Sequence, residues 1–260
     1  MSNPVFTRME ADWREQEAFK QVQESYNAPA VVPAGRMTYD DVVVRTGLSL
    51  LTLTVMAALS WWFTTVSPGA AGVVMGVSSV VGLIVAMVNI FGKQIRPALV
   101  LLYSGLQGVA LGSLSALVQA ALPGVVIQAV IATVVVFSVT LLLFASGKVR
   151  NSPKLMKFAL ISLIGIILSR LLIWILTSVG VLSPALTDVT FLGIPLPVFI
   201  SLFAVVVGAI CLIGDFDQVR IGVQMGAPAK YAWACAFGIM VTVVWLYVEI
   251  LNILSQMNRN

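Results

Sequence analysis

The sequence contains no histidine, only two cysteines and few charged residues. Without histidine, a His-based catalytic triad, a histidine proton relay and a histidine-ligated zinc site are all excluded. Cys211 and Cys235 both fall inside apolar segments, so we expect no disulfide framework and predict that each packs as a small apolar side chain. The polar N-terminus has no apolar stretch behind a basic start, so no cleavable signal peptide is expected.

Charge is scarce and unevenly distributed. Only 10% of the 260 residues are charged and 59% are apolar, whereas soluble domains are about a quarter charged. Residues 1–41 carry four basic and seven acidic groups, and residues 42–260 carry eleven basic and four acidic groups. Basic loops beside a membrane explain this pattern, so we expect an integral membrane protein in a lipid bilayer, with no nucleic-acid partner.

Most of the chain consists of apolar runs that are long enough to cross a bilayer. Backbone in lipid must satisfy its own hydrogen bonds, so each run should be helical. The sequence therefore predicts an all-α, polytopic membrane protein with seven helices. They are expected at residues 42–66, 70–91, 97–121, 123–146, 157–178, 194–217 and 229–255.

Lys and Arg residues lie in alternate loops. One set of loops has eight of them, and the opposite loops at 67–69, 121–124 and 179–193 have none. By the positive-inside rule, the N-terminus is predicted to be cytoplasmic and the C-terminus to lie outside the cell membrane. The eight are Lys93, Arg96, Lys148, Arg150, Lys154, Lys157, Arg220 and Lys230.

Residues 1–41 are interpreted as a cytoplasmic arm ahead of a membrane domain at 42–260. Apolar residues from Phe6 to Tyr26 approximate helical spacing among charged residues. The arm could be an amphipathic helix on the lipid surface, or a docking or oligomerisation segment; the oligomeric state stays open. Residues 28–36 have the composition of a linker.

Small and aromatic residues predict packing and anchoring. Glycines at four-residue spacing indicate close helix packing: Gly72, Gly76, Gly108 and Gly112. Four aromatic residues near the outer span ends are expected to be interfacial anchors: Trp61, Trp62, Trp174 and Tyr247.

Three acids stand in or at the end of apolar spans, where a carboxylate costs roughly 2.5 kcal/mol or more on insertion scales. They are Asp215, Asp217 and Glu249. Residues two apart on a helix point to nearly opposite faces, so Asp215 and Asp217 cannot both line one site. Asp217 could be solvated at the span end or pair with Arg220. Such acids are usually functional, so all three are candidates for pH sensing or an ion pathway.

Glu249 should face the bundle interior or water, and its partner is open between two residues. Asp215 could share a proton with it. Arg170 is the only basic residue deep in a span, and it could either snorkel or pair with Glu249. If the last helix begins at Lys230, Glu249 lies about 28 Å along it. It could not then reach Asp215, and Arg170 would be the better partner.

Several segments resemble the Bax inhibitor/YccA-like family, and most closely its bacterial branch with an Asp-Phe-Asp motif. The most specific lie in the last third of the chain. The segments are Thr38–Gly47, Gln107–Gly112, Ser201–Asp217, Gly226–Tyr231 and Trp245–Asn252. The resemblance implies a seven-helix bundle whose last helix is central.

The resemblance also implies a pH-sensitive calcium leak governed by an acid on each of the last two helices. Asp215 and Glu249 match those acids and are also the candidate metal ligands. The stretch that matches the family's latch arginine begins at Asn89, and the nearest bases are Lys93 and Arg96. Since 34 residues separate Asp215 from Glu249, they meet only if the sixth helix continues past Asp215 and part of 225–235 is not helical.

Three functions compete. The first is a calcium leak channel, in which calcium is the transported ion and no cofactor is expected. The second is a non-conducting regulator that binds a membrane protease or another partner. An intramembrane aspartyl protease is disfavoured because Leu212 replaces the first glycine of the Gly-x-Gly-Asp signature, and we expect no enzyme activity.

Overall fold

The computed structural model describes residues 35–92, 96–149, 151–180, 190–191 and 194–258. The chain divides into two units, Met1–Arg36 and Met37–Asn260. The second unit begins at Met37, whereas the predicted membrane domain begins at Val42. The predicted amphipathic arm and most of the linker lie outside the described residues, as does most of the predicted loop at 179–193.

In the part of the chain that the structure describes, seven helices of the second unit are long and apolar enough to cross a membrane, as the sequence predicted, and the chain is a multi-pass membrane protein. The short helix η1 (Pro68–Ala70) leads into α3, and η3 (Ala229–Tyr231) leads into α8. Strands β1 (Thr190–Phe191) and β2 (Ile194–Pro195) form an antiparallel pair before α7. The helices are α2 (Tyr39–Val66), α3 (Ala71–Phe91), α4 (Pro97–Ala121), α5 (Val125–Ala145), α6 (Pro153–Ser178), α7 (Leu196–Gln224) and α8 (Ala232–Met257).

Local sequence explains where the helices begin. The Thr38 hydroxyl accepts a hydrogen bond from the Asp41 N–H while the Asp41 carboxylate accepts one from the Thr38 N–H, which forms a capping box for α2. Pro97 and Pro153 occupy the first positions of α4 and α6, where a missing N–H costs nothing.

The sixth span continues seven residues beyond its predicted end. Helix α7 reaches Gln224 and is closed by Gly226, which adopts a positive φ of 63°. The Ala227 N–H then bonds to the Gly222 carbonyl, satisfying the last turn. Consequently Asp215 and Asp217 lie inside a helix rather than at its end.

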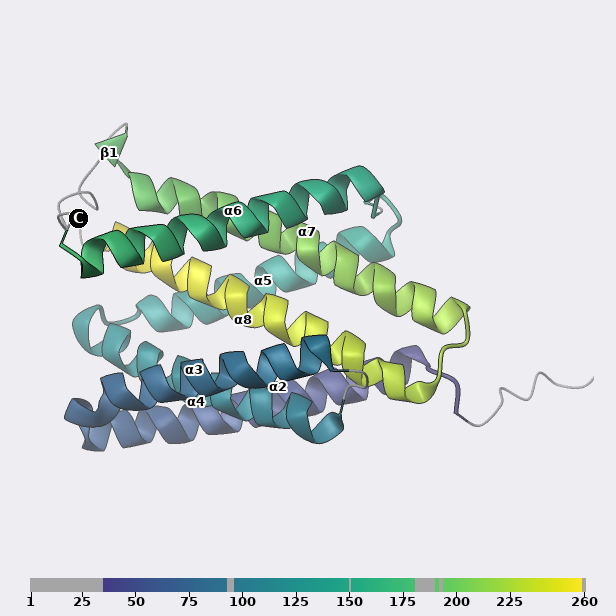
Figure 1. Cartoon of the computed structure of the whole chain (residues 1–260), viewed down its shortest axis with the longest axis horizontal. Helices are drawn as coiled ribbons and strands as arrows, with labels where there is room; N and C mark the ends of the chain where they lie inside the picture. Colours follow the sequence, from purple (N-terminus) through teal and green to yellow (C-terminus); the bar gives the residue numbers. More distant parts are fainter. Residues whose placement is uncertain (1–34, 93–95, 150, 181–189, 192–193, 259–260) are drawn as a thin grey trace, which may run out of the picture. The chain divides into compact units, whose positions relative to one another are not determined.

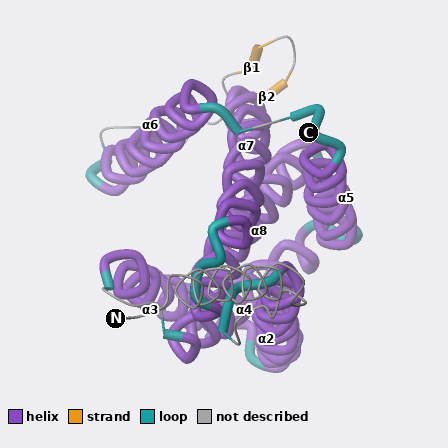
Figure 2. The backbone as a smooth tube through the Cα atoms, turned by 90° about the vertical axis from the view of Figure 1, so that its right-hand side faces the viewer, coloured by secondary structure: helices purple, strands orange, loops and turns teal. Residues whose placement is uncertain are grey.

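Helix α8 is the centre of the bundle, as the family resemblance implied. Sixty-one per cent of its membrane window is buried, against 12% for α6 and 50% for α4, the next most buried helix. It packs against α2, α4, α5 and α7. Figure 1 shows α8 in yellow between α6 and α7 on one side and α2, α3 and α4 on the other, and Figure 2 shows the same central position end-on.

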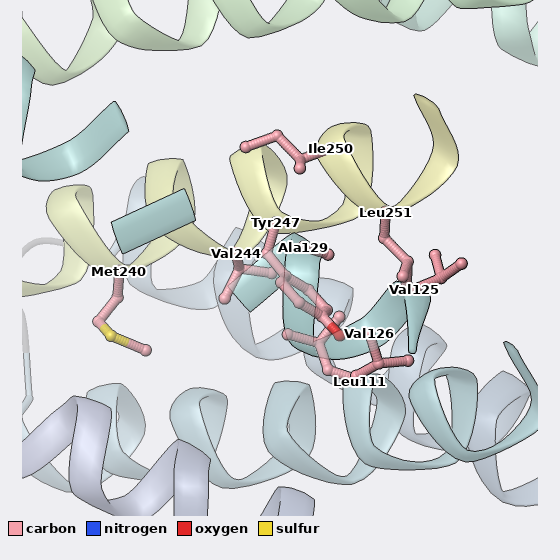
Figure 3. Close-up of a cluster of buried hydrophobic side chains, with 9 residues drawn as sticks. All are labelled: Leu111, Val125, Val126, Ala129, Met240, Val244, Tyr247, Ile250 and Leu251. Carbon is pink, nitrogen blue, oxygen red and sulfur yellow. The ribbon is translucent and has the colours of Figure 1, made fainter. Parts of the chain in front are cut away.

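The main apolar core joins α4, α5 and α8 around Leu111, Ala129 and Val244 (Figure 3). The interfacial role predicted for Tyr247 is wrong, because its side chain is buried in this core. The Tyr247 hydroxyl forms a 2.6 Å hydrogen bond with the Ser115 hydroxyl of α4. This bond satisfies the Tyr247 hydroxyl, so the side chain can be buried without an unpaired polar group.

The glycine spacing predicted close packing correctly in α4 and incorrectly in α3. A Cβ at Gly108 would lie 2.3 Å from the Leu53 carbonyl oxygen, and one at Gly112 would lie 2.2 Å from the Ala57 carbonyl oxygen. These glycines let α4 approach α2 closely. Gly72 and Gly76 have nothing within 4 Å of a Cβ, so their spacing reflects no close approach within this chain.

Candidate functional site

Glu249 is the most completely enclosed carboxylate among the described residues. It is 1% exposed on the central helix α8. The Arg170 Nη2 of α6 donates to its Oε2 at 2.6 Å, and the Trp245 indole Nε1 donates to its Oε1 at 2.9 Å. The predicted Arg170–Glu249 pair is therefore confirmed, and each carboxylate oxygen has a donor.

A polar network continues from this ion pair toward the C-terminal end of α8. Arg170 also donates to the Ser201 hydroxyl of α7 at 3.3 Å, and Asn252 donates to the same hydroxyl at 2.9 Å. The Gln256 amide donates to the Asn252 side-chain oxygen at 2.9 Å. The network joins α6, α7 and α8 through side chains alone.

Sequence reasoning missed most of this network. Trp245, Glu249, Asn252 and Gln256 follow a three- and four-residue spacing, so a polar stripe on one face of the last helix was a usable signal. Ser201 gave no such signal, because one serine in an apolar span is also common in structural packing.

Asp215 occupies a different part of the α7–α8 contact. Its half-buried carboxylate accepts a 2.7 Å hydrogen bond from the Thr242 hydroxyl. A Cβ placed on Gly238 would lie 3.1 Å from Asp215 Oδ1, so the absence of a side chain there makes room for the acid. In the described part of the chain, no Lys or Arg pairs with Asp215.

The two family acids are not brought together. Asp215 lies beside Gly238 and Thr242, and Glu249 is seven residues beyond Thr242, or about 10 Å along α8. Although α7 does continue past Asp215, α8 is helical from Ala232, so Glu249 is carried beyond reach. A proton or metal ion shared by Asp215 and Glu249 is therefore not the arrangement found. The described residues also hold no cluster of three His, Cys, Asp or Glu side chains suited to a metal ion.

Asp217 faces away from Asp215, as the helical spacing predicted. Its Oδ1 lies 2.8 Å from Arg220 Nη2, and the Asn151 amide donates to its Oδ2 at 3.2 Å. The predicted pair with Arg220 is confirmed. The alternative prediction, that Asp217 is solvated, is wrong, because Asp217 is only 7% exposed. It is buried where α7 meets the residues that precede α6.

Asn89 is the first residue of the stretch that the sequence matched to the family's latch arginine. It is 1% exposed on α3, and neither its amide nitrogen nor its amide oxygen has a hydrogen-bond partner among the described residues.

Comparison with known proteins shows which family this chain belongs to. A family model described as Bax inhibitor 1 like matches residues 3–259, nearly the whole chain. No curated protein matches the sequence. With seven membrane-spanning helices, a central α8 and a match of this extent, the chain belongs to the Bax inhibitor 1 like family.

Proposed function

We propose that this protein is a pH-sensitive cation leak channel of the cell membrane, with calcium as the transported ion and with protonation of buried acids as the gate. The observation that carries the proposal is the position, burial and hydrogen bonding of Asp215. Asp215 is an acid in the last third of α7, half-buried against the central helix, with the Thr242 hydroxyl as its hydrogen-bond donor.

An acid in that position has two ways to lower the cost of its charge. It can take up a proton, or it can be neutralised by a cation that approaches from water. Oxygen ligands suit calcium, which takes six to eight of them. One carboxylate supports only weak binding, which fits a leak better than a storage site.

Glu249 supplies the second element of the proposal, a lock between helices. Helix α6 is the least buried span and packs mainly against α7. The Arg170–Glu249 pair is its ionic link to the central helix. Protonation of Glu249 would remove the charge that holds Arg170, so α6 could move relative to α8.

Calcium flux into proteoliposomes tests the proposal. The wild-type protein should admit calcium with a pH-dependent rate, measured with a trapped calcium dye. Asp215→Asn should lower the flux and flatten its pH dependence, and Glu249→Gln should change the pH dependence. Asp217→Asn is the matched control, because Asp217 is a buried acid of the same helix on another face. Full wild-type behaviour in both test variants would contradict the role of the acids, and a wild-type protein that passes no calcium would contradict the channel itself.

A further inference from the structure

The start of the central helix is attached to the start of α2. Among the described residues, no side chain caps the first turn of η3 or of α8, and an uncapped helix end leaves backbone groups without a partner. The attachment comes from α2, where the Arg45 side chain donates a hydrogen bond to the Ala229 carbonyl of η3. Figure 1 shows the purple start of α2 beside the start of α8.

Arg45 makes three contacts at once. Besides its bond to Ala229, its Nη2 lies 3.2 Å from Asp41 Oδ1, and its guanidinium carbon lies 5.6 Å from the centre of the Trp233 ring of α8. The Arg45 side chain is only 17% exposed, so it does not snorkel into water or headgroups. A cation gains nothing from the helix dipole at an N-terminal end. What Arg45 contributes is therefore the attachment that these contacts make.

Met37 attaches the same part of the chain to the end of α7. Its N–H donates to the Ala227 carbonyl at 2.7 Å, and its side chain is 2% exposed. A Cβ placed on Gly222 of α7 would lie 3.2 Å from the Met37 sulfur and from its terminal methyl. The side chain also packs in one apolar cluster with residues of α7 and α8. Residues 37–45 thus hold the end of α7 and the start of α8 in one fixed relation.

The site at Asp215 depends on that relation. The Asp215 carboxylate on α7 accepts a 2.7 Å hydrogen bond from Thr242 on α8, and its Oδ1 would lie 3.1 Å from a Cβ on Gly238. Trp233 precedes Gly238 by five residues and Thr242 by nine, or about 8 and 14 Å along the helix. Helix α8 is continuous over this stretch, so a shift or rotation at Trp233 reaches both positions.

We propose that Arg45 is a positioning residue for the acid site. By holding the start of α8, Arg45 sets the height and rotation of that helix against α7 and thereby places Thr242 on Asp215. The consequence for calcium flux rests on the proposed function, whereas the consequence for the contact between α7 and α8 does not. The two consequences can therefore be measured separately.

The chemistry of arginine distinguishes this role from that of a positive charge alone. A planar guanidinium can bond a carbonyl and a carboxylate and lie over an aromatic ring at the same time, whereas a lysine ammonium is a point charge on a flexible stem. Arg45→Lys keeps the charge and loses part of the contact set. Arg45→Met keeps only the apolar stem, so the two variants should differ in degree.

The native thiol of Cys235 reports on the contact between α7 and α8. Cys235 lies on α8 one turn before Gly238 and packs against a cluster that includes residues of α7. The sequence has two cysteines, so Cys211→Ala leaves Cys235 as the single thiol. The rate at which a maleimide labels Cys235 in the folded full-length protein measures how closely the two helices pack, without any measurement of flux.

Arg45→Met should raise the labelling rate of Cys235 several-fold, and Arg45→Lys should raise it less. Lys230→Met is the matched control, because it removes an exposed base from the same turn and should label at the wild-type rate. Gly112→Ala, which strains the contact of α4 with α2, controls for a general loss of stability and should also leave the rate unchanged. Wild-type labelling in both Arg45 variants, or equally fast labelling in Gly112→Ala, would overturn the proposal.

Calcium flux then relates the position of α8 to the gate. Arg45→Met should lower the flux and flatten its pH dependence, as Asp215→Asn is expected to do. The double variant should show no further fall, because the two substitutions act on one element. A further, additive fall would place the action of Arg45 elsewhere and overturn the proposal. Faster labelling with wild-type flux would uphold the positioning of α8 and contradict the proposed role of Asp215 instead.

Discussion

The guanidinium of Arg170 on α6 lies 2.6 Å from the carboxylate of Glu249 on α8, although 79 residues separate the two in the chain. Glu249 is 1% exposed, whereas the Arg170 side chain is 40% exposed. The acid is thus held inside the bundle by a base that reaches it from the periphery. Arg170 can be solvated without the pair, whereas Glu249 would be left as a buried charge, so Glu249 is the residue that needs the pair.

Arg170→Leu should destabilise the protein, because it leaves a buried carboxylate with only the Trp245 donor. Breaking a fully buried pair costs about 3–5 kcal/mol. A loss on the order of 2 kcal/mol is expected here, since the half-exposed Arg170 leaves a path for water. Thermal unfolding in detergent measures it. The double variant Arg170→Leu with Glu249→Leu should recover most of the loss, and strictly additive effects would show that the pair is not coupled.

Arg170→Leu should also change the pH response of calcium flux. Removing the guanidinium removes the ionic link between α6 and α8 on which the proposed lock depends. Flux in proteoliposomes over a pH series measures the response, with Lys157→Leu as a control at an exposed base of the same helix. An unchanged response in Arg170→Leu would remove Arg170 from the mechanism.

Asp217→Asn should lower stability and leave the pH response of calcium flux as in the wild type. The substitution weakens contacts with Arg220 and Asn151, and hydrogen bonds to charged groups contribute about 1.5–3 kcal/mol. Unfolding temperature and calcium flux, measured on the same preparation, separate the two effects. A flattened pH response would mean that the gate includes the Asp217 face of α7 as well as Asp215.

Gly238→Ala should reduce calcium flux several-fold with little loss of folding. The added methyl would lie 3.1 Å from Asp215 Oδ1 and would take the space of a cation or water beside that carboxylate. Gly165→Ala, with open space around its Cβ, is the control. Wild-type flux in Gly238→Ala would argue that nothing needs to approach Asp215 from the α8 side.

Gly112→Ala should destabilise the α2–α4 contact by about 1–3 kcal/mol, the usual cost of overpacking. The new Cβ would lie 2.2 Å from the Ala57 carbonyl oxygen, which belongs to helix backbone and cannot rotate away. Gly76→Ala on α3 has nothing within 4 Å and should be neutral or stabilising by up to about 1 kcal/mol. Equal unfolding temperatures for the two variants would contradict the close approach.

The positions of the helices were predictable because lipid leaves the backbone few choices. Apolar runs of membrane length, broken by Pro97, Pro153 and similar residues, predicted seven helices whose bounds differ from those found by a few residues in most cases. The end of α7 was the exception. The apolar run stops near Asp217, but α7 continues to Gln224, because acidic residues can be part of a helix. The helix ends only where Gly226 adopts a positive φ.

The sequence by itself determined that this is a seven-helix membrane protein with three acids in apolar spans, since composition and hydrophobic length are properties of the chain. It also determined that Asp215 and Asp217 face apart, since that follows from helical geometry. Only the tertiary structure decided that Glu249 meets Arg170 and that Asp215 meets Thr242. Which side chains meet depends on how the helices are rotated and shifted against one another, and these are set by packing across the whole bundle rather than by any local pattern.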